Sequence, residues 1–248
     1  QDPPDRIMPG PLKWDLTNGI ATDTPESLMN SGLDPATEAT QGRAFAEDLP
    51  SRNLNPAETR VLTVAIKPKA GRTYCSTWNV TDFKGRPITV AFAARVLAEP
   101  DDAGRERLIC RAMNWRGVSD APAEPADDPG QSILDGPSQP GVHRALVDLT
   151  SWRLLKWLDE PCPFYDWRAR EDGGFIVHAD DASEIAAMAA EFEKGPTSRV
   201  LRLRAVDGGW TPIHVTAHRV EIVDDTHAGL LSLRLPTEDD VNPPPRKL

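Results

Sequence analysis

One short stretch of this chain occurs twice. Residues 87–96 read PITVAFAARV, and residues 212–220 read PIHVTAHRV, which is one residue shorter. Each copy is followed by an acidic loop that ends in Ala-Gly, over residues 101–104 and 224–229, and then by another apolar run. A repeated supersecondary unit of this kind predicts two related domains in tandem.

The length and the positions of the prolines fit two domains joined by a linker. The 248 residues are enough for two domains of ordinary size. Prolines gather at the start of the chain and again in an acidic stretch near its middle, as is typical of extended linkers. We therefore expect, in chain order, a linker over residues 1–11, a first domain over 12–117, a linker over 118–142, a second, shortened domain over 143–236 and a tail over 237–248.

The pattern of the first domain predicts a hairpin, short helices and an antiparallel meander. Asn18-Gly19 between two β-compatible runs is a strong hairpin signal for residues 13–24. Thr24 followed by Pro25 predicts the start of a short helix, and we expect another helix over residues 36–48. Sequential strands joined by short turns predict the meander, with strands over residues 61–66, 73–80, 88–97 and 108–115.

The second domain begins with an apolar segment whose period is ambiguous. Residues 142–158 fit either an amphipathic helix or a strand followed by a helix. Further on, Asp181 with Glu184 three residues later has the capping-box pattern, which predicts a helix that ends at Gly195. Three strands are expected after this helix, over residues 199–206, 210–220 and 230–235.

The net charge, the lengths of the apolar runs and the spacing of the cysteines argue against several kinds of partner and site. The formal net charge is -10, which repels phosphate backbones and anionic lipid, so we expect no nucleic-acid partner. No apolar run approaches the roughly 20 residues that cross a bilayer, so no membrane span is expected. Cys75, Cys110 and Cys162 are widely spaced and odd in number, which argues against a disulfide framework and a zinc site. We therefore expect a cytoplasmic location.

Motifs in both halves resemble PAS sensory domains. In the second half, His178-Ala179-Asp180-Asp181 leads into the predicted helix, and a strand, an Asp-Gly turn, a Trp-initiated strand, an acidic loop and a last strand follow. This order resembles the His-Pro-Asp-Asp helix and the final three strands of PAS domains, with Ala179 in place of the proline. In the first half, residues 13–19 (KWDLTNG) are similar to the opening strand of many PAS domains, and the meander over 73–115 is similar to their end.

A narrower resemblance rests on residues 10–16 (GPLKWDL) and 112–115 (AMNW). They are similar to a mycobacterial family of PAS-containing proteins of unassigned function, in which a further N-terminal domain precedes the part present here. The resemblance implies an α+β fold with two tandem PAS-like domains, each an antiparallel sheet with helices on one face. It also implies a sensory or signalling module that is not an enzyme and that binds a ligand or a partner.

Several partners remain open under this interpretation. A PAS-like sheet curls around a small cavity that holds a ligand or nothing, so we expect a small apolar ligand, a protein partner or a homodimer paired through residues 142–158. The alternatives are a pure scaffold without ligand and an enzyme whose site is assembled from scattered residues. No cofactor is expected, and the sequence assigns no catalytic residue, no metal ligand and no cofactor-binding residue.

Three histidines and three acidic pairs are candidates for a metal-binding or cofactor-binding site. His214 and His218 share one side of the strand over 210–220, opposite Ile213, Val215 and Ala217, which we expect in the core. Two residues four apart on a strand are about 13 Å apart, which is too far to bind one ion. His178 is best placed to ligate a haem, but capping of the next helix is the simpler role. We expect the acidic pairs at 101–102, 127–128 and 239–240 to be solvated.

Two groups of residues are expected in cores. Cys75 and Cys110 fall in predicted strands and are expected to act as small core hydrophobes. The aromatic residues from Trp152 to Trp167 are expected in a core or a contact between domains rather than on an exposed partner surface.

Overall fold

The computed structural model describes residues 8–48, 56–118, 139–168, 177–191, 194–223 and 225–241. These residues form two compact units, the first within residues 8–118 and the second within residues 139–241. Each unit is described by itself. Most of the predicted linker over 118–142, and the first seven residues of the predicted N-terminal linker, lie outside the described residues.

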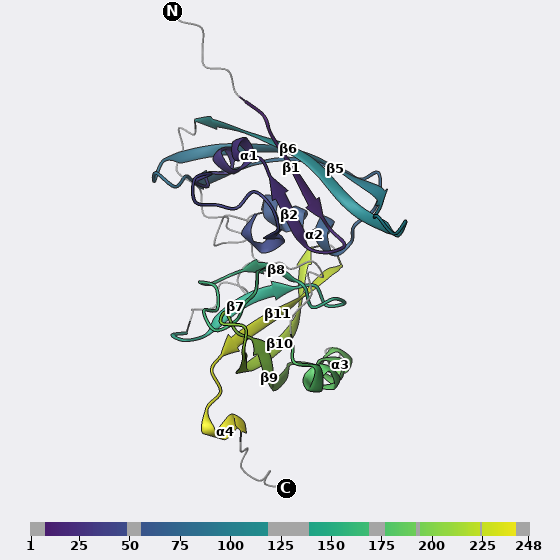
Figure 1. The fold of residues 1–248 in the computed structure, drawn as a ribbon, viewed down its shortest axis with the longest axis vertical. Helices are drawn as coiled ribbons and strands as arrows, with labels where there is room; N and C mark the ends of the chain where they lie inside the picture. The colour runs from purple at the N-terminus through teal and green to yellow at the C-terminus, as the bar shows by residue number, and fades with distance from the viewer. Residues whose placement is uncertain are drawn as a thin grey trace, which may run out of the picture. The chain divides into compact units, whose positions relative to one another are not determined.

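The first unit is a six-stranded antiparallel sheet with short helices (Figure 1). Across the sheet the strand order is β3-β2-β1-β6-β5-β4. The strands are β1 (Gly10–Asp15), β2 (Ile20–Asp23), β3 (Arg43–Ala44), β4 (Thr73–Thr81), β5 (Pro87–Pro100) and β6 (Glu106–Val118). The helices are α1 (Pro25–Asn30), the 3-10 helix η1 (Phe45–Glu47) and α2 (Pro56–Ile66).

The predicted hairpin and the helix after it are confirmed. Asp15 pairs with Ile20 across the turn, and Gly19 has a φ of 71°, in the left-handed region that favours glycine. The Thr24 hydroxyl accepts a hydrogen bond of 3.1 Å from the Ser27 amide and so caps α1. The strand β1 begins at Gly10, inside the segment predicted to be a linker over 1–11, because Gly10 and the next residue pair with β6.

Two helix and strand predictions in this unit are wrong. Residues 61–66, predicted as a strand, form the second half of α2. Val61, Leu62, Val64 and Ala65 are at most 4% exposed, which is the spacing of one helix face rather than the alternation of a strand. The helix predicted over 36–48 is absent, and β3 and η1 are formed there instead.

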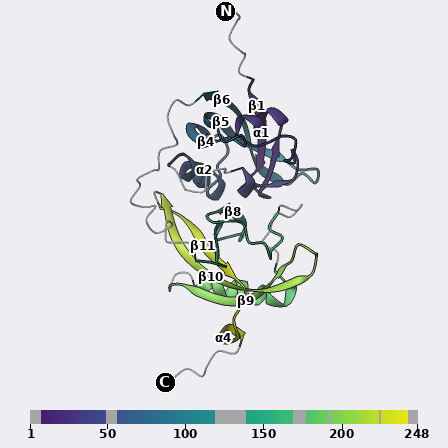
Figure 2. The same cartoon turned by 90° about the vertical axis from the view of Figure 1, so that its left-hand side faces the viewer.

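The core of the first unit is aromatic. Trp14 of β1 stacks on Phe92 of β5 with ring centroids 5.1 Å apart, and the Phe45 ring meets Trp14 edge-on at 5.1 Å. Helix α2 lies against the sheet in both views (Figure 1, Figure 2). Its Val61 side chain lines the same small space in the core as Trp14 and Phe92. A Cβ atom at Gly10 would overlap the backbone of Ser27, so β1 and α1 pack at a distance that only glycine permits.

The second unit is a five-stranded antiparallel sheet with the strand order β8-β7-β11-β10-β9. The strands are β7 (His143–Val147), β8 (Leu154–Trp157), β9 (Thr197–Arg204), β10 (Trp210–Val223) and β11 (Thr226–Arg234). The helices are the 3-10 helix η3 (Ala179–Asp181), α3 (Ala182–Glu191) and α4 (Glu238–Val241). Figure 2 shows the strong curvature of β10 and β11.

Apart from β3 at the edge of the first sheet, the two sheets share one strand order. In each, the first two strands of the unit pair beside its last strand, and the last strand pairs with the one before it. The repeated stretch lies on β5 in the first unit and on β10 in the second, and both strands have 14 residues. These antiparallel sheets with few helices confirm the α+β fold class, and the sequence repeat coincides with equivalent strands.

The ambiguous segment over 142–158 forms strands β7 and β8, so the helix expected there for pairing of two chains is wrong. Ala145, Leu146 and Val147 are consecutive and all at most 1% exposed. A strand that is covered on both faces loses the alternating pattern, which is why its period could not be read. The aromatic residues Trp152 and Trp157 are buried in this unit, as expected for a core position.

The predicted helix after residue 181 is confirmed, but its cap is different. The His178 ring nitrogen Nδ1 accepts a hydrogen bond of 3.2 Å from the Asp180 amide and so caps η3, which runs into α3. Asp181, predicted to be the cap, instead binds the Arg202 guanidinium at 2.7 Å. Glu184, its predicted partner in the capping box, pairs with Arg199 at 2.8 Å.

Candidate functional site

The expected ligand cavity inside the first unit is almost completely filled. The space among Trp14, Val61, Tyr74 and Phe92 measures about 10 Å³, which is about the room for one water molecule. The aromatic side chains of β1 and β5 occupy the position where a small apolar ligand was expected. A wider depression of about 710 Å³ on this unit is formed by exposed turn residues, and the Asp101–Arg105 pair within it is already joined at 2.8 Å.

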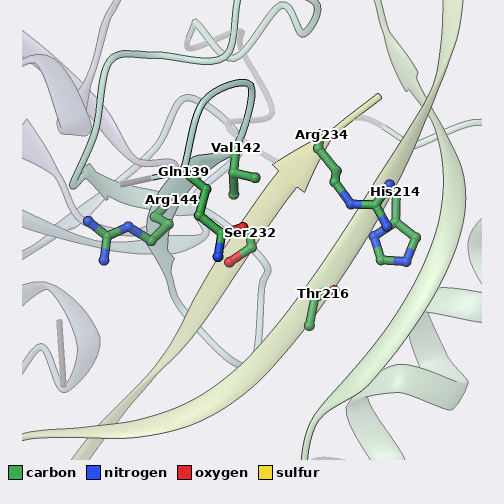
Figure 3. Close-up of a pocket in the computed structure, with 7 residues that line it drawn as sticks. All are labelled: Gln139, Val142, Arg144, His214, Thr216, Ser232 and Arg234. Atoms are coloured by element: carbon green, nitrogen blue, oxygen red, sulfur yellow. The ribbon is translucent and has the colours of Figure 1, made fainter. Parts of the chain in front are cut away.

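The second unit carries a pocket of about 290 Å³ on its sheet (Figure 3). Its lining comes from β10, β11, β7 and the segment before β7, and consists of Gln139, Val142, Arg144, His214, Thr216, Ser232 and Arg234. Six of these seven side chains are polar. The pocket therefore places hydrogen-bonding and charged groups beside the apolar parts of the same side chains, so it is not the purely apolar cavity that we expected.

Strand register explains why these side chains meet. His214 lies opposite Arg234, and Thr216 lies opposite Ser232, which in turn lies opposite Arg144 on β7. Directly opposed residues of antiparallel strands project from the same face. The pocket residues thus share one face of three neighbouring strands.

The other face of β10 is the core face, as predicted. Ile213, Val215 and Ala217 are fully buried there. His214 is on the opposite face and lines the pocket, whereas His218, on that same face, is outside the lining. No cluster of three or more His, Cys, Asp or Glu side chains that could hold a metal ion is found among the described residues.

One corner of the pocket is built around Asp240 of α4. Its carboxylate accepts two hydrogen bonds from the Arg234 guanidinium, of 2.6 and 2.8 Å. The His214 Nε2 atom lies 3.4 Å from the same carboxylate. Hydrogen bonds from Arg234 and from Thr237 hold the pKa of Asp240 well below its usual range, so this carboxylate is ionised at neutral pH.

His214 is neutral at physiological pH in this setting. Burial, and then the positive charge of Arg234, lower the pKa of its imidazole, and the charge of Asp240 opposes this. A neutral imidazole has one donor and one acceptor nitrogen. His214 therefore can both donate to and accept from a bound group.

The opposite end of the pocket holds a second arginine with its own aspartate. The Arg144 Nε and Nη2 atoms donate to the Asp159 carboxylate at 2.8 and 2.9 Å. Bonding to Arg144 lowers the pKa of Asp159. In strand order, Ser232 of β11 lies between Arg144 of β7 and Thr216 of β10, and the Thr216 hydroxyl is 2.9 Å from the Ser198 hydroxyl of β9. Two ion pairs and hydroxyl groups on one sheet face suit a small polar ligand.

The remaining sequence candidates lie elsewhere. The His178 ring packs edge-on against Trp210 with centroids 4.9 Å apart, and its capping bond confirms the simpler role over haem ligation. Cys110 is buried as expected, and burial raises its pKa, whereas Cys75 is exposed on β4, which contradicts the core prediction. A cysteine on an edge strand can face solvent even where its neighbours alternate into the core.

Sequence reasoning missed the residues that make the pocket. Asp240 was expected to be solvated, but its side chain is only 14% exposed and paired with Arg234. The available signal was Thr237 followed by Asp240 three residues later, which is a helix-start pattern. No signal in a single sequence connects Arg144 with Arg234, because strand register alone brings them together.

In the described parts of the chain, no helix combines the length and the apolar character needed to cross a bilayer. No curated protein matches the chain significantly.

Family models and one crystal structure match the chain closely. The model of the Rv3651-like middle domain matches residues 8–117, and that of the Rv3651-like C-terminal domain matches residues 127–243. A crystal structure of an uncharacterized protein from Mycobacterium tuberculosis is 54% identical, with a TM-score of 0.84. The match covers 97% of this chain and 70% of that one.

Two more distant structures are sensory proteins by their titles. A sensory box histidine kinase/response regulator from Burkholderia thailandensis E264 is 17% identical over 44% of this chain and 75% of that chain, with a TM-score of 0.26. An RNA-binding light-oxygen-voltage receptor is 12% identical over 92% of this chain and 95% of that chain, with a TM-score of 0.31. Both TM-scores are too low to carry an argument. The high identity to the M. tuberculosis protein and the two domain models together show that the chain belongs to the Rv3651-like family.

Proposed function

We propose that this chain is a non-catalytic sensory or interaction module whose second unit binds a small polar ligand in the pocket on β7, β10 and β11. The observation that carries this proposal is the pocket itself. The pocket measures about 290 Å³, and its lining includes two arginines, a neutral imidazole and hydroxyl groups that project from one face of the sheet. The PAS-like character of both units and a cytoplasmic location belong to the same proposal.

A binding role suits the pocket better than a catalytic one. Nucleophilic catalysis needs a nucleophile within hydrogen-bond reach of a base. The Thr216 hydroxyl is bonded to Ser198, and His214 faces Arg234 and Asp240. These contacts hold the polar groups in place for recognition, and a guanidinium has the geometry to bind a carboxylate or phosphate through two parallel hydrogen bonds.

Thermal shift with a panel of metabolites tests the proposal on the whole chain. A ligand that binds the native state raises the melting temperature by mass action. We expect hits among small polar compounds, and we expect Thr216→Val to reduce the shift of each hit because it removes a pocket hydroxyl. The matched control is Thr77→Val on β4 of the first unit, where the threonine is exposed, and it should leave the shift unchanged.

Two outcomes would contradict the proposal. If no small polar compound raises the melting temperature or appears in native mass spectrometry, the pure scaffold becomes the better interpretation. If hits appear but respond equally to Thr216→Val and Thr77→Val, the ligand binds elsewhere on the chain.

A further inference from the structure

The Asp240 carboxylate makes the contacts that a bound carboxylate ligand would make. Its Oδ1 atom accepts from Arg234 Nη2 at 2.8 Å and lies 3.4 Å from His214 Nε2. Its Oδ2 atom accepts from Arg234 Nη1 at 2.6 Å, from the Thr237 amide at 2.6 Å and from the Thr237 hydroxyl at 2.7 Å. A guanidinium that grips both oxygens of a carboxylate is the common recognition geometry for carboxylate ligands.

Among the described residues, the segment that brings Asp240 to the pocket is held mainly by Arg234, which also donates to the Leu235 carbonyl at 3.1 Å. Helix α4 has four residues, and a helix this short is marginal without tertiary contacts. Leu235, Glu238 and Asp239 are exposed. The contacts of Asp240 with Arg234 and His214 therefore provide much of what fixes residues 235–241 against the sheet.

We propose that Asp240 is an internal occupant of a carboxylate-binding corner formed by Arg234 and His214, and that a ligand carboxylate binds by displacing it. This inference rests on the proposed function of the pocket and names the class of ligand. The ligand presents its carboxylate to Arg234, and its polar remainder lies toward Ser232 and the Gln139 amide (Figure 3). Residues 235–241 then act as a lid that leaves the sheet when the ligand enters.

An internal competitor weakens the apparent affinity for the ligand. When the binding-competent state is only a fraction of the population, the apparent dissociation constant is the intrinsic one divided by that fraction. A tethered group also acts at a high effective concentration, in the millimolar range for a short flexible connection. Removing the Asp240 charge should therefore tighten carboxylate binding, by about tenfold if the closed state holds roughly nine-tenths of the molecules.

The test uses acetate as the probe and acetamide, which has the same shape without the charge, as its control. The chain is compared with Asp240→Asn and with Asp239→Asn, which removes a neighbouring exposed charge. Binding is followed by NMR through the His214 imidazole signals and the amide signals of residue 235 and residues 237–241. We expect acetate to bind Asp240→Asn about tenfold more tightly than it binds the unchanged chain or Asp239→Asn, and acetamide to bind none of them.

The lid itself has a separate readout. In Asp240→Asn without acetate, the amides of residue 235 and residues 237–241 should become more mobile, and the His214 pKa should fall because the opposing charge is gone. Addition of acetate should raise the His214 pKa again while the lid stays mobile. Asp239→Asn should show neither change.

The outcomes separate this inference from the function on which it rests. If acetate binds Asp240→Asn and the unchanged chain equally, displacement of Asp240 is wrong although the pocket still binds carboxylates. If acetate binds neither while other polar compounds raise the melting temperature, the ligand class is wrong and the pocket function stands. If neither acetate nor any polar compound binds, the displacement of Asp240 and the proposed function of the pocket are both wrong.

Discussion

A buried arginine in the first unit is surrounded by three carboxyl groups. The Arg43 side chain is 2% exposed and pairs with Asp23 at 2.8 Å, with Asp48, and with Glu47 at 3.5 Å. The Trp14 indole N–H donates to the same Asp48 carboxyl. Burial and the charge of Asp23 raise the pKa of Asp48 to about 7, against the opposing effects of Arg43 and Trp14. One arginine thus does not keep every neighbouring acid ionised.

This shift predicts a pH dependence of stability. A carboxyl whose folded pKa of about 7 exceeds its ordinary value of 3.8 stabilises the fold fully below about pH 4. That contribution is lost as the pH rises through 7. Asp48→Asn cannot ionise, so its free energy of unfolding relative to the unchanged chain should increase between about pH 5 and pH 8, by on the order of 2 kcal/mol. Urea denaturation at several pH values measures this difference.

Asp102→Asn is the matched control, because Asp102 is exposed in the loop between β5 and β6. Its stability difference from the unchanged chain should stay flat over the same pH range. A flat difference for Asp48→Asn as well would show that Asp48 is already ionised below pH 5.

Two hairpins of the first sheet use the same five-residue turn. In the turn between β4 and β5, the Asp82 carboxylate accepts from the amides of Lys84 and Arg86, both at 2.9 Å, and Gly85 has a φ of 77°. Between β5 and β6, the Asp101 carboxylate accepts hydrogen bonds from the amides of Ala103 and Arg105, at 2.9 and 2.8 Å. The turn between β9 and β10 has the same backbone bonds but carries Ala205 in the aspartate position.

The two aspartates should differ in their importance for stability. Asp82 is 4% exposed and also accepts a hydrogen bond of 3.2 Å from Arg116 on β6. Asp101 lies in an exposed turn with Arg105 as its partner. Removing a buried acceptor leaves its donors unsatisfied, so Asp82→Ala should lower the melting temperature at least twice as much as Asp101→Ala. Differential scanning calorimetry of both variants checks this, and equal losses would contradict it.

Local sequence signals predicted some of these elements correctly and failed for others. Asn18-Gly19 marked its turn correctly, because the tendency of glycine to adopt a left-handed backbone conformation is a property of that one residue. Val61 and Val64 suggested a strand, and only packing against the sheet shows that their run is a helix face. The run through Leu146 gave no period, because it is buried on both sides. The missing information is tertiary in each of these cases.

The described parts of the two units have the same order of five strands, to which the first unit adds β3. All six strands of the first sheet come from residues 10–118, and all five of the second come from residues 143–234. The repeat on β5 and β10 predicted that the two units would share this order. The pocket was not predictable, because Arg144 and Arg234 lie on different strands and only the strand register brings them to one sheet face.

Each unit should fold without the other. Fragments over residues 1–129 and 130–248 separate the described residues of the two compact units. Because each sheet closes its own core, we expect both fragments to unfold cooperatively on heating and to give well-dispersed amide spectra. A fragment that is unfolded on its own would show that its core needs the other unit.

The position of Asp240 has a mechanical consequence. It lies six residues beyond Arg234, which it grips, so any tension applied to the chain after this point pulls directly on the carboxylate. With residues 235–241 acting as the proposed lid, a pull on the chain beyond Asp240 would separate its carboxylate from Arg234 and free the guanidinium for a ligand.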